Sequence, residues 1–214
     1  MASYNSDDEQ LDVIRDWLKE NGKAMVAGAV IAVAGVVGWQ QWGAYQERAA
    51  ESASIAYLQL IDARETGADP DTVDRRGRVV MDDHGRFVYA AMAGLQLADY
   101  HVGRGALDEA ASALRWIVDN SDKDAFRHMA RLRLAQVLIA SDSHEEAMRV
   151  LDVPSMGSYR SQYLERRGDA HAALGRVEQA QEAYDQVLEL EEVTNTRRTL
   201  IRLKRNDLAG ETPA

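Results

Sequence analysis

Histidine and acidic side chains are the residues of this chain best suited to catalysis or metal binding. The five histidines share no spacing typical of metal ligands, such as that of an HExxH helix: His84, His101, His128, His144 and His171. Asp82-Asp83-His84 is the densest cluster, but it falls where a helix is expected to end, and polar residues are common there. Gly103-x-Gly105 has no strand before it, which argues against a phosphate-binding loop. The sequence therefore predicts no catalytic, metal or cofactor site and no enzyme.

Composition narrows the class of protein further. The 214 residues carry a net charge of −10, which disfavours nucleic acid as a partner because phosphates would be repelled. The chain has no cysteine, so disulfides and thiolate chemistry are excluded, while the redox compartment stays open. Only three prolines occur, which suits an all-α protein.

One apolar stretch divides the chain, from Ala24 to Tyr45, and it contains no charged residue. A bilayer core requires a helix of about 20 apolar residues, so residues 24–45 are predicted to be a transmembrane anchor. Trp39 and Trp42 lie at its end, where aromatic rings favour the headgroup level. Two alternatives are a buried core helix, which is usually shorter and carries a polar stripe, and a cleaved signal peptide. The leader of 23 residues is mostly acidic rather than basic, which favours an uncleaved anchor.

Basic residues at the two ends of the span predict its orientation. Arg15, Lys19 and Lys23 precede it, whereas Arg48 alone lies at a similar distance after it. Because positive residues concentrate on the cytoplasmic side, the N-terminus is expected in the cytoplasm and residues 46–214 outside.

Residues 1–23 are predicted to be an acidic tail with one short amphipathic helix. Leu11, Ile14 and Leu18 recur at helical spacing, and Asn21-Gly22 is expected to end the helix before the membrane. This helix either rests at the membrane interface or docks a partner, and the sequence leaves both open.

Small residues form a stripe along one face of the span: Ala24, Gly28, Ala32 and Gly35. Such stripes let helices approach closely in lipid, so these residues are candidates for a transmembrane interface. The alternative is that glycine and alanine are simply common in membrane helices.

A repeated pattern organises residues 46–214, after a first helix up to Glu65 and a second from Asp71 or Thr72 to about Asp83. In each of three units a small residue is followed by an alanine twelve positions later, at Ala98 and Ala110, Ala135 and Ala147, and Gly168 and Ala180. The units lie 37 and 33 residues apart, close to the period of about 34 of tetratricopeptide helix pairs. Small residues at these positions are expected where two helices cross closely. The domain is therefore predicted to be a tetratricopeptide-like solenoid.

Local signals mark the ends of the predicted helices. Turns are expected around Gly105, Asp142 and Gly175, and Ser143 with Glu146 has the spacing of a capping box. The last helix begins after Thr194 or Asn195 and is basic. It is expected to cap the solenoid with a solvated outer face, and contact with headgroups or an acidic partner is the alternative.

Specific motifs flank the end and the beginning of the apolar span and precede the helical repeats: Glu20-Asn21-Gly22-Lys23, Gly38-Trp39 with Trp42, and Ser52-Ala53-Ser54-x-Ala56-Tyr57. In these motifs and in the repeats that follow them, the chain resembles the YfgM family of ancillary Sec translocon subunits. The resemblance implies a bacterial inner-membrane protein with a cytoplasmic N-terminus and a periplasmic repeat domain. It also implies association with the SecYEG translocon and with PpiD, a periplasmic foldase-like partner. Because the shared motifs are structural, the resemblance transfers no catalytic residues.

The sequence thus predicts a membrane-anchored scaffold beside the translocon that passes newly translocated periplasmic or outer-membrane proteins to periplasmic chaperones. An adaptor or assembly factor for another envelope complex would share the anchor and the repeats. A holdase that binds unfolded clients directly is the other alternative, and it would need exposed apolar residues in the groove.

Overall fold

The computed structural model describes residues 5–210, with side chains described for residues 14–208. Residues 1–4, the start of the predicted acidic tail, and the side chain of Leu11 lie outside this description. The described residues are all-α, as expected, and form two compact units that divide between Glu51 and Ser52.

A single helix, α1 (Asn5–Glu65), contains the predicted span and continues past it to the expected end at Glu65. The prediction that Asn21-Gly22 ends a separate short helix was wrong. Asn21 Nδ2 donates to the carbonyl oxygen of Trp17, 3.0 Å away and one turn back, which is compatible with a continuous helix. A glycine within a helix costs only about 1 kcal/mol, which long helical sequences on both sides offset.

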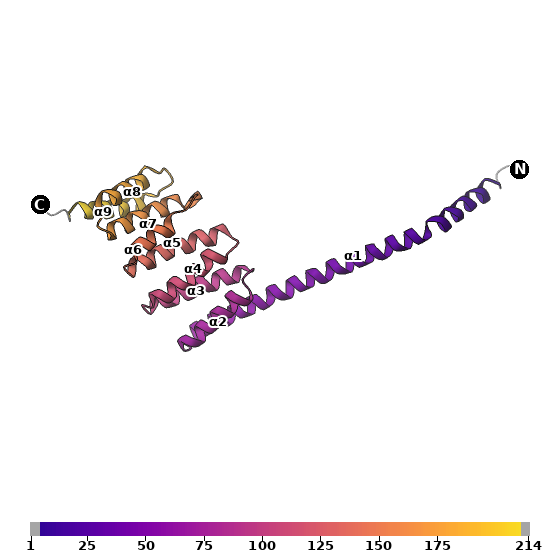
Figure 1. The fold of residues 1–214 in the computed structure, drawn as a ribbon, viewed down its shortest axis with the longest axis horizontal. Coiled ribbons are helices and arrows are strands. Elements are labelled where there is room, and N and C mark those ends of the chain that lie inside the picture. Colours follow the sequence, from indigo (N-terminus) through magenta and orange to yellow (C-terminus); the bar gives the residue numbers. More distant parts are fainter. Residues whose placement is uncertain (1–4, 211–214) are drawn as a thin grey trace. The chain divides into compact units, whose positions relative to one another are not determined.

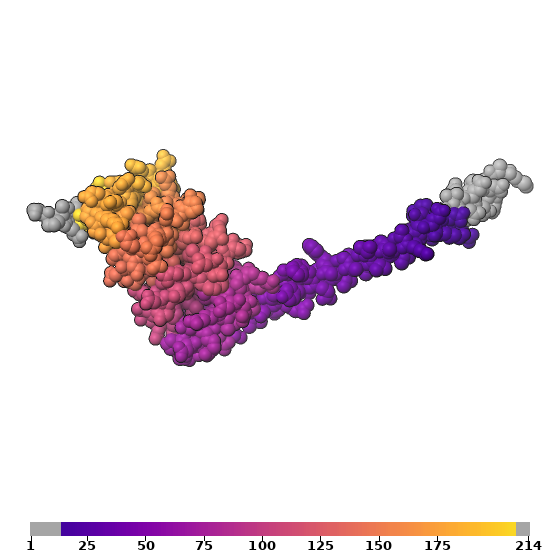
Figure 2. Space-filling model, viewed as in Figure 1, coloured from indigo at the N-terminus to yellow at the C-terminus, as the bar shows by residue number. Residues whose placement is uncertain are grey.

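Part of α1 is long and apolar enough to cross a membrane, and none of the apolar window within it is buried in the protein. Its valines and tryptophans are exposed side chains, and Trp39 is 80% accessible. Figure 2 shows this part of α1, in indigo and violet, as one extended helix. The interpretation as a buried core helix therefore fails for the described residues. A bare apolar surface of this length is what a lipid environment would cover.

The second unit is a succession of packed helices that begins with residues 52–65 of α1. Figure 1 shows helices α2 to α9 stacked in chain order within this unit. Their bounds are α2 (Pro70–Asp83), α3 (Val88–Gly103), α4 (Leu107–Asn120), α5 (Asp124–Ala140), α6 (His144–Leu151), the 3-10 turn η1 (Gly157–Tyr159), α7 (Arg160–Ala173), α8 (Val177–Glu189) and α9 (Asn195–Gly210). The three predicted units are the pairs α3–α4, α5–α6 and α7–α8.

The caps of these helices agree only partly with the sequence signals. Asp69 caps α2 by accepting from the backbone N–H of Thr72 at 2.9 Å and from its hydroxyl at 2.7 Å. The hydrogen bonds from Thr72 hold the pKa of the Asp69 carboxyl below its usual range. The prediction of a capping box at Ser143 was wrong, because the Ser143 side chain makes no cap hydrogen bond. Glu146 instead forms an ion pair with Arg115 on α4, 2.6 Å away. The ion pair with α4 therefore engages the Glu146 carboxylate that a capping box would have used at the start of α6.

The turns inside the three helix pairs share one backbone conformation. Gly105, Asp142 and Gly175 have φ values of 74°, 59° and 68°, in the left-handed region that ends a helix. The backbone N–H of the next residue then bonds a carbonyl five positions back, for example Arg176 to His171 at 2.9 Å. Asp142 occupies the position that glycine fills in the other two units, which is tolerated because aspartate visits this region more readily than most residues.

The last helix, α9, is held by charge as much as by apolar packing. Ile201 and Leu208 are buried in a cluster with α7 and α8 residues. The carboxylate of Glu165 on α7, only 3% exposed, is paired by Arg197 and by Lys204, the latter at 2.9 Å. Lys204 also bonds Asp169 at 2.8 Å.

Two further arginines of α9 are also used within the domain. Arg198 donates to the carbonyl oxygens of Leu188 and Leu190 at the end of α8, and Arg205 lies 2.6 Å from Asp185. The predicted capping role of α9 is thus supported, and its basic character serves internal pairing. Thr194 accepts from the backbone of Arg197 at 3.4 Å, a long bond at the expected N-cap.

We predict that Glu165→Gln lowers the free energy of unfolding by about 3 kcal/mol and exposes α9 first. A glutamine leaves Arg197 and Lys204 beside a buried neutral group, and breaking a buried ion pair typically costs about 3–5 kcal/mol. Urea unfolding of the whole chain, with hydrogen exchange of the α9 amides, measures both effects. The matched control is Asp185→Asn, whose partly exposed pair with Arg205 contributes less than about 1 kcal/mol. Equal effects of the two substitutions would contradict the assignment.

Candidate interaction surfaces

All six residues proposed for the helix crossings are buried: Ala98, Ala110, Ala135, Ala147, Gly168 and Ala180. One of them, Gly168, marks a close approach, because an added Cβ would lie 2.5 Å from the ring of Tyr184 on α8. Two further close approaches were not predicted from the sequence: an added Cβ would lie 2.4 Å from Leu97 at Gly77 and 2.8 Å from Ile117 at Gly94. Gly94 lies four residues before Ala98, so helical spacing from the known crossing would have indicated it.

The four small residues of the span, Ala24, Gly28, Ala32 and Gly35, are all exposed. A Cβ added at Gly28 or Gly35 would meet nothing within 4 Å. The stripe is therefore available for a partner, and its role as an interface stays a prediction.

The two histidines at matching repeat positions lie between packed helices. His101 is buried, with Nε2 2.8 Å from a carboxylate oxygen of Asp74 on α2. His171 occupies the same place in the third unit, where burial and neighbouring arginines lower its pKa. Among the described residues no group of three or more histidine, aspartate or glutamate side chains could hold a metal ion.

A third histidine joins α5 to α7 through an aromatic contact. His128 Nδ1 lies 2.9 Å from the hydroxyl of the fully buried Tyr163, and its ring stacks on Tyr159 with centroids 4.9 Å apart. Burial lowers the pKa of His128 and raises that of Tyr163. Both pKa shifts favour the neutral forms of the two side chains, in which the contact is a hydrogen bond between uncharged groups.

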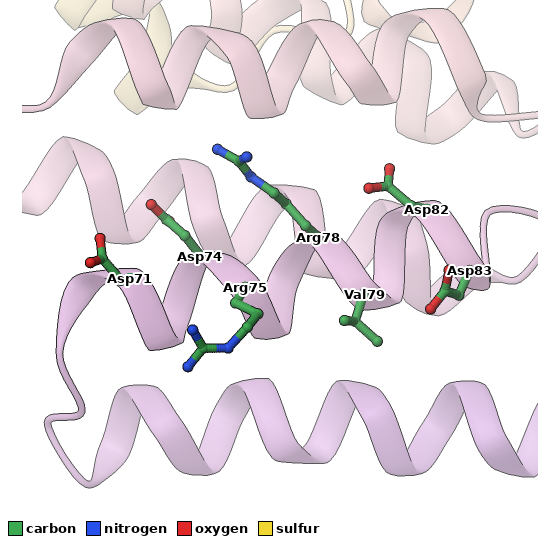
Figure 3. A pocket seen from close by; sticks show the side chains of 7 residues that line it. All are labelled: Asp71, Asp74, Arg75, Arg78, Val79, Asp82 and Asp83. Carbon is green, nitrogen blue, oxygen red and sulfur yellow. The ribbon is translucent and has the colours of Figure 1, made fainter.

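The surface of the repeat domain is hollowed along α2 and at two junctions between helices. The first hollow, of about 420 Å³, is lined by seven residues of α2 alone, so no second element closes it. Figure 3 shows Asp74, Arg78 and Asp82 projecting from one side of α2, while Arg75 and Val79 project from the other. The four-residue spacing of the first three explains their common direction.

A second hollow, the α2–α4 cleft, lies beside it and has about 440 Å³. Its floor and wall are apolar or aromatic except for His101, and consist of Met81, Leu97, His101, Ala113 and Trp116. Its rim is polar and mostly acidic, and consists of Asp74, Arg78, Asp82, Asp108, Glu109 and Ser112. The sequence analysis missed this cleft because its charges come from two helices separated by α3.

A third hollow of about 420 Å³, the α6–α7 cleft, stands at the corresponding junction two units later. It is lined by Glu145, Met148, Arg149, Asp152, Arg167 and His171. Its acidic groups are paired inside the protein, Glu145 with Arg176 at 2.5 Å and Asp152 with Arg167 at 3.8 Å.

Comparison with known proteins gives a consistent picture. The tetratricopeptide repeat-like domain family matches residues 15–210. A protein of Escherichia coli named ancillary SecYEG translocon subunit is 27% identical over 98% of this chain and all of its own length. Proteins of the same name from Neisseria gonorrhoeae and Aggregatibacter actinomycetemcomitans are 24% and 27% identical over 97% and 88% of this chain, and over 100% and 92% of their own. No solved structure gives a significant match.

We predict that Gly168→Ala lowers the free energy of unfolding by about 1–3 kcal/mol, because the new methyl group would collide with the Tyr184 ring. Thermal unfolding of the whole chain measures the loss. Gly103→Ala is the control, since its Cβ would meet nothing within 4 Å and alanine favours the helix. A stability of Gly168→Ala at or above that of the native chain would refute the close crossing.

The neutral His128 predicts a pH dependence of stability. Because its pKa is lowered by folding, the folded state binds the proton less readily, and stability falls as pH drops through the unfolded value of about 6.5. His128→Gln removes this term, so urea unfolding at about pH 7.5 and about pH 5 should show a smaller loss for the variant. His171 retains its own term in both proteins. Identical losses would show that folding does not lower the pKa of His128.

Proposed function

The chain belongs to the YfgM family of tetratricopeptide repeat-like proteins, and on that premise we propose that it is an ancillary subunit of the SecYEG translocon in a bacterial inner membrane. The observation that carries this proposal is similarity over nearly the full length, span included, to proteins of that name. The family's helical repeats form a scaffold, and the chain is accordingly not an enzyme.

We infer the arrangement in the membrane from the exposed span and its flanking charges. We place the anchor at residues 24–45, residues 1–23 in the cytoplasm, and residues 46–214 in the periplasm. The excess of Arg15, Lys19 and Lys23 over Arg48 supports this orientation. The small-residue stripe of the span is the surface proposed to contact the translocon.

The repeat domain is proposed to receive newly translocated periplasmic and outer-membrane proteins and to pass them to periplasmic chaperones, together with a PpiD-like foldase. Tethering raises the effective concentration of such partners, so weak contacts suffice. An adaptor of another envelope complex would co-purify with different proteins. A direct holdase would slow the aggregation of an unfolded client without any partner.

Photo-crosslinking in native membranes tests this proposal. Probes at Gly28 and Gly35 are sterically tolerated, and probes at Val30 and Val37 on the opposite side of the helix are the matched controls. We expect Gly28 and Gly35 to crosslink to SecYEG several-fold more than the controls do. A probe at the exposed Gly103 should crosslink to a PpiD-like protein or a translocating chain.

Crosslinks of the span only to a second copy of itself would overturn the translocon assignment. Equal crosslinking from both sides of the helix would overturn the specific role of the stripe. If only the Gly103 products were missing, the anchor assignment would stand and the hand-off of clients would fall.

A further inference from the structure

The α2–α4 cleft combines a buried apolar floor, an aromatic wall and a charged rim. The floor is formed by Met81 and Leu97, which are 5% and 4% exposed, and the wall by the half-buried Trp116. An aromatic wall over an apolar floor suits the stem of a long side chain whose charged end stays at the rim.

The charges of the rim are not balanced within the protein. The carboxylate of Asp74 lies 2.8 Å from Nε2 of His101. The carboxylates of Asp82, Asp108 and Glu109 form no ion pair or hydrogen bond with other described residues. Arg78 is the one arginine or lysine among the lining residues, and its guanidinium is likewise unpaired in this part of the chain. The cleft therefore presents an excess of negative charge.

At the corresponding junction two units later, the α6–α7 cleft, an arginine of the protein itself neutralises the acidic charge. Asp152 and His171 stand in the α6–α7 cleft at the repeat positions of Asp82 and His101. There Arg167 enters the cleft, bonds the carbonyl oxygen of Leu151 at the end of α6 at 2.9 Å, and lies 3.8 Å from Asp152. The position equivalent to Arg167 is Leu97, so the first junction lacks this internal cation.

The end of α2 makes the missing cation more significant. The last turn of α2 contains no basic residue, so the negative end of its dipole is not offset from within the helix. A guanidinium bound there would face the Asp82 carboxylate and this helix end, as Arg167 does at the end of α6. Arginine matches such a site because its planar group forms several directed hydrogen bonds and stacks on aromatic rings.

We propose that the α2–α4 cleft binds an arginine or lysine side chain of a partner polypeptide, with arginine preferred. The side-chain stem packs on Met81 and Trp116, and the charge lies between Asp82 and Glu109 in the place that Arg167 fills in the α6–α7 cleft. This inference deepens the proposed function by naming the chemistry of the partner segment, and it rests on that function only in requiring a polypeptide partner.

The test uses the whole chain in nanodiscs of zwitterionic lipid, labelled with fluorotryptophan. The chain has four tryptophans, and Trp116→Phe assigns the resonance of Trp116. The probe is a short blocked peptide with one arginine between glycines, compared with the same peptide carrying citrulline, which has the same shape but no charge. We expect the arginine peptide to shift the Trp116 signal saturably and the citrulline peptide to shift it at least about fivefold less.

Substitutions at the rim and in the other cleft complete the design. Asp82→Asn and Glu109→Gln should each weaken arginine binding about three- to fivefold, because each removes one exposed countercharge. Arg78→Gln should strengthen it by removing the competing cation. Asp152→Asn, in the internally balanced α6–α7 cleft, should leave it unchanged. These rim side chains are exposed, so the variants are expected to fold.

The proposal is overturned if the arginine peptide gives no saturable shift, if citrulline binds equally, or if Asp152→Asn weakens binding as much as Asp82→Asn does. Its failure is distinguishable from failure of the proposed function, because crosslinking of the span to SecYEG is measured independently. Crosslinks from Gly28 to SecYEG without arginine binding would support the translocon assignment and contradict the proposed role of the cleft. Arginine binding without those crosslinks would support the role of the cleft and contradict the translocon assignment.

Discussion

The repeat domain depends on close contact between paired helices, which requires glycine or alanine where they cross. At Gly168 the ring of Tyr184 occupies the space that a side chain would need, and Gly94 and Gly77 accommodate Ile117 and Leu97 in the same way. Each crossing buries one face of two helices, and the next unit covers the face that remains. Stability is therefore distributed over neighbouring contacts, and a larger residue at any crossing would separate a pair along its length.

Charged side chains are used differently at the two ends of the domain. At the C-terminal end the buried Glu165 collects cations from α9, so the last helix closes the stack through ion pairs. At the junction of α2, α3 and α4 the carboxylates of Asp82 and Glu109 have no such partner among the described residues. An acidic chain thus uses its basic residues internally at one end and leaves an acidic cleft at the other.

Most of the architecture could be predicted from the sequence because it follows from local patterns. The apolar stretch, the small residues at Ala98 and Gly168, and the turns at Gly105 and Gly175 each determine structure within a few residues. The failures have the opposite origin. Asn21-Gly22 did not end its helix, because the helical sequence on both sides outweighs one weak breaker. Glu146 left its local motif for Arg115, 31 residues away in sequence. The Glu165 cluster and the α2–α4 cleft bring together side chains from separate helices, which no pattern along one segment encodes.

The central claim is that the span separates a cytoplasmic leader from a periplasmic repeat domain, and accessibility of single cysteines tests it most directly. The chain has no cysteine, so Asp16→Cys and Gly103→Cys each provide one unique label site. With a membrane-impermeant maleimide on intact spheroplasts, the account predicts that Gly103→Cys reacts at once and that Asp16→Cys reacts only after the membrane is permeabilised. The reverse pattern, or reaction of both before permeabilisation, would contradict it.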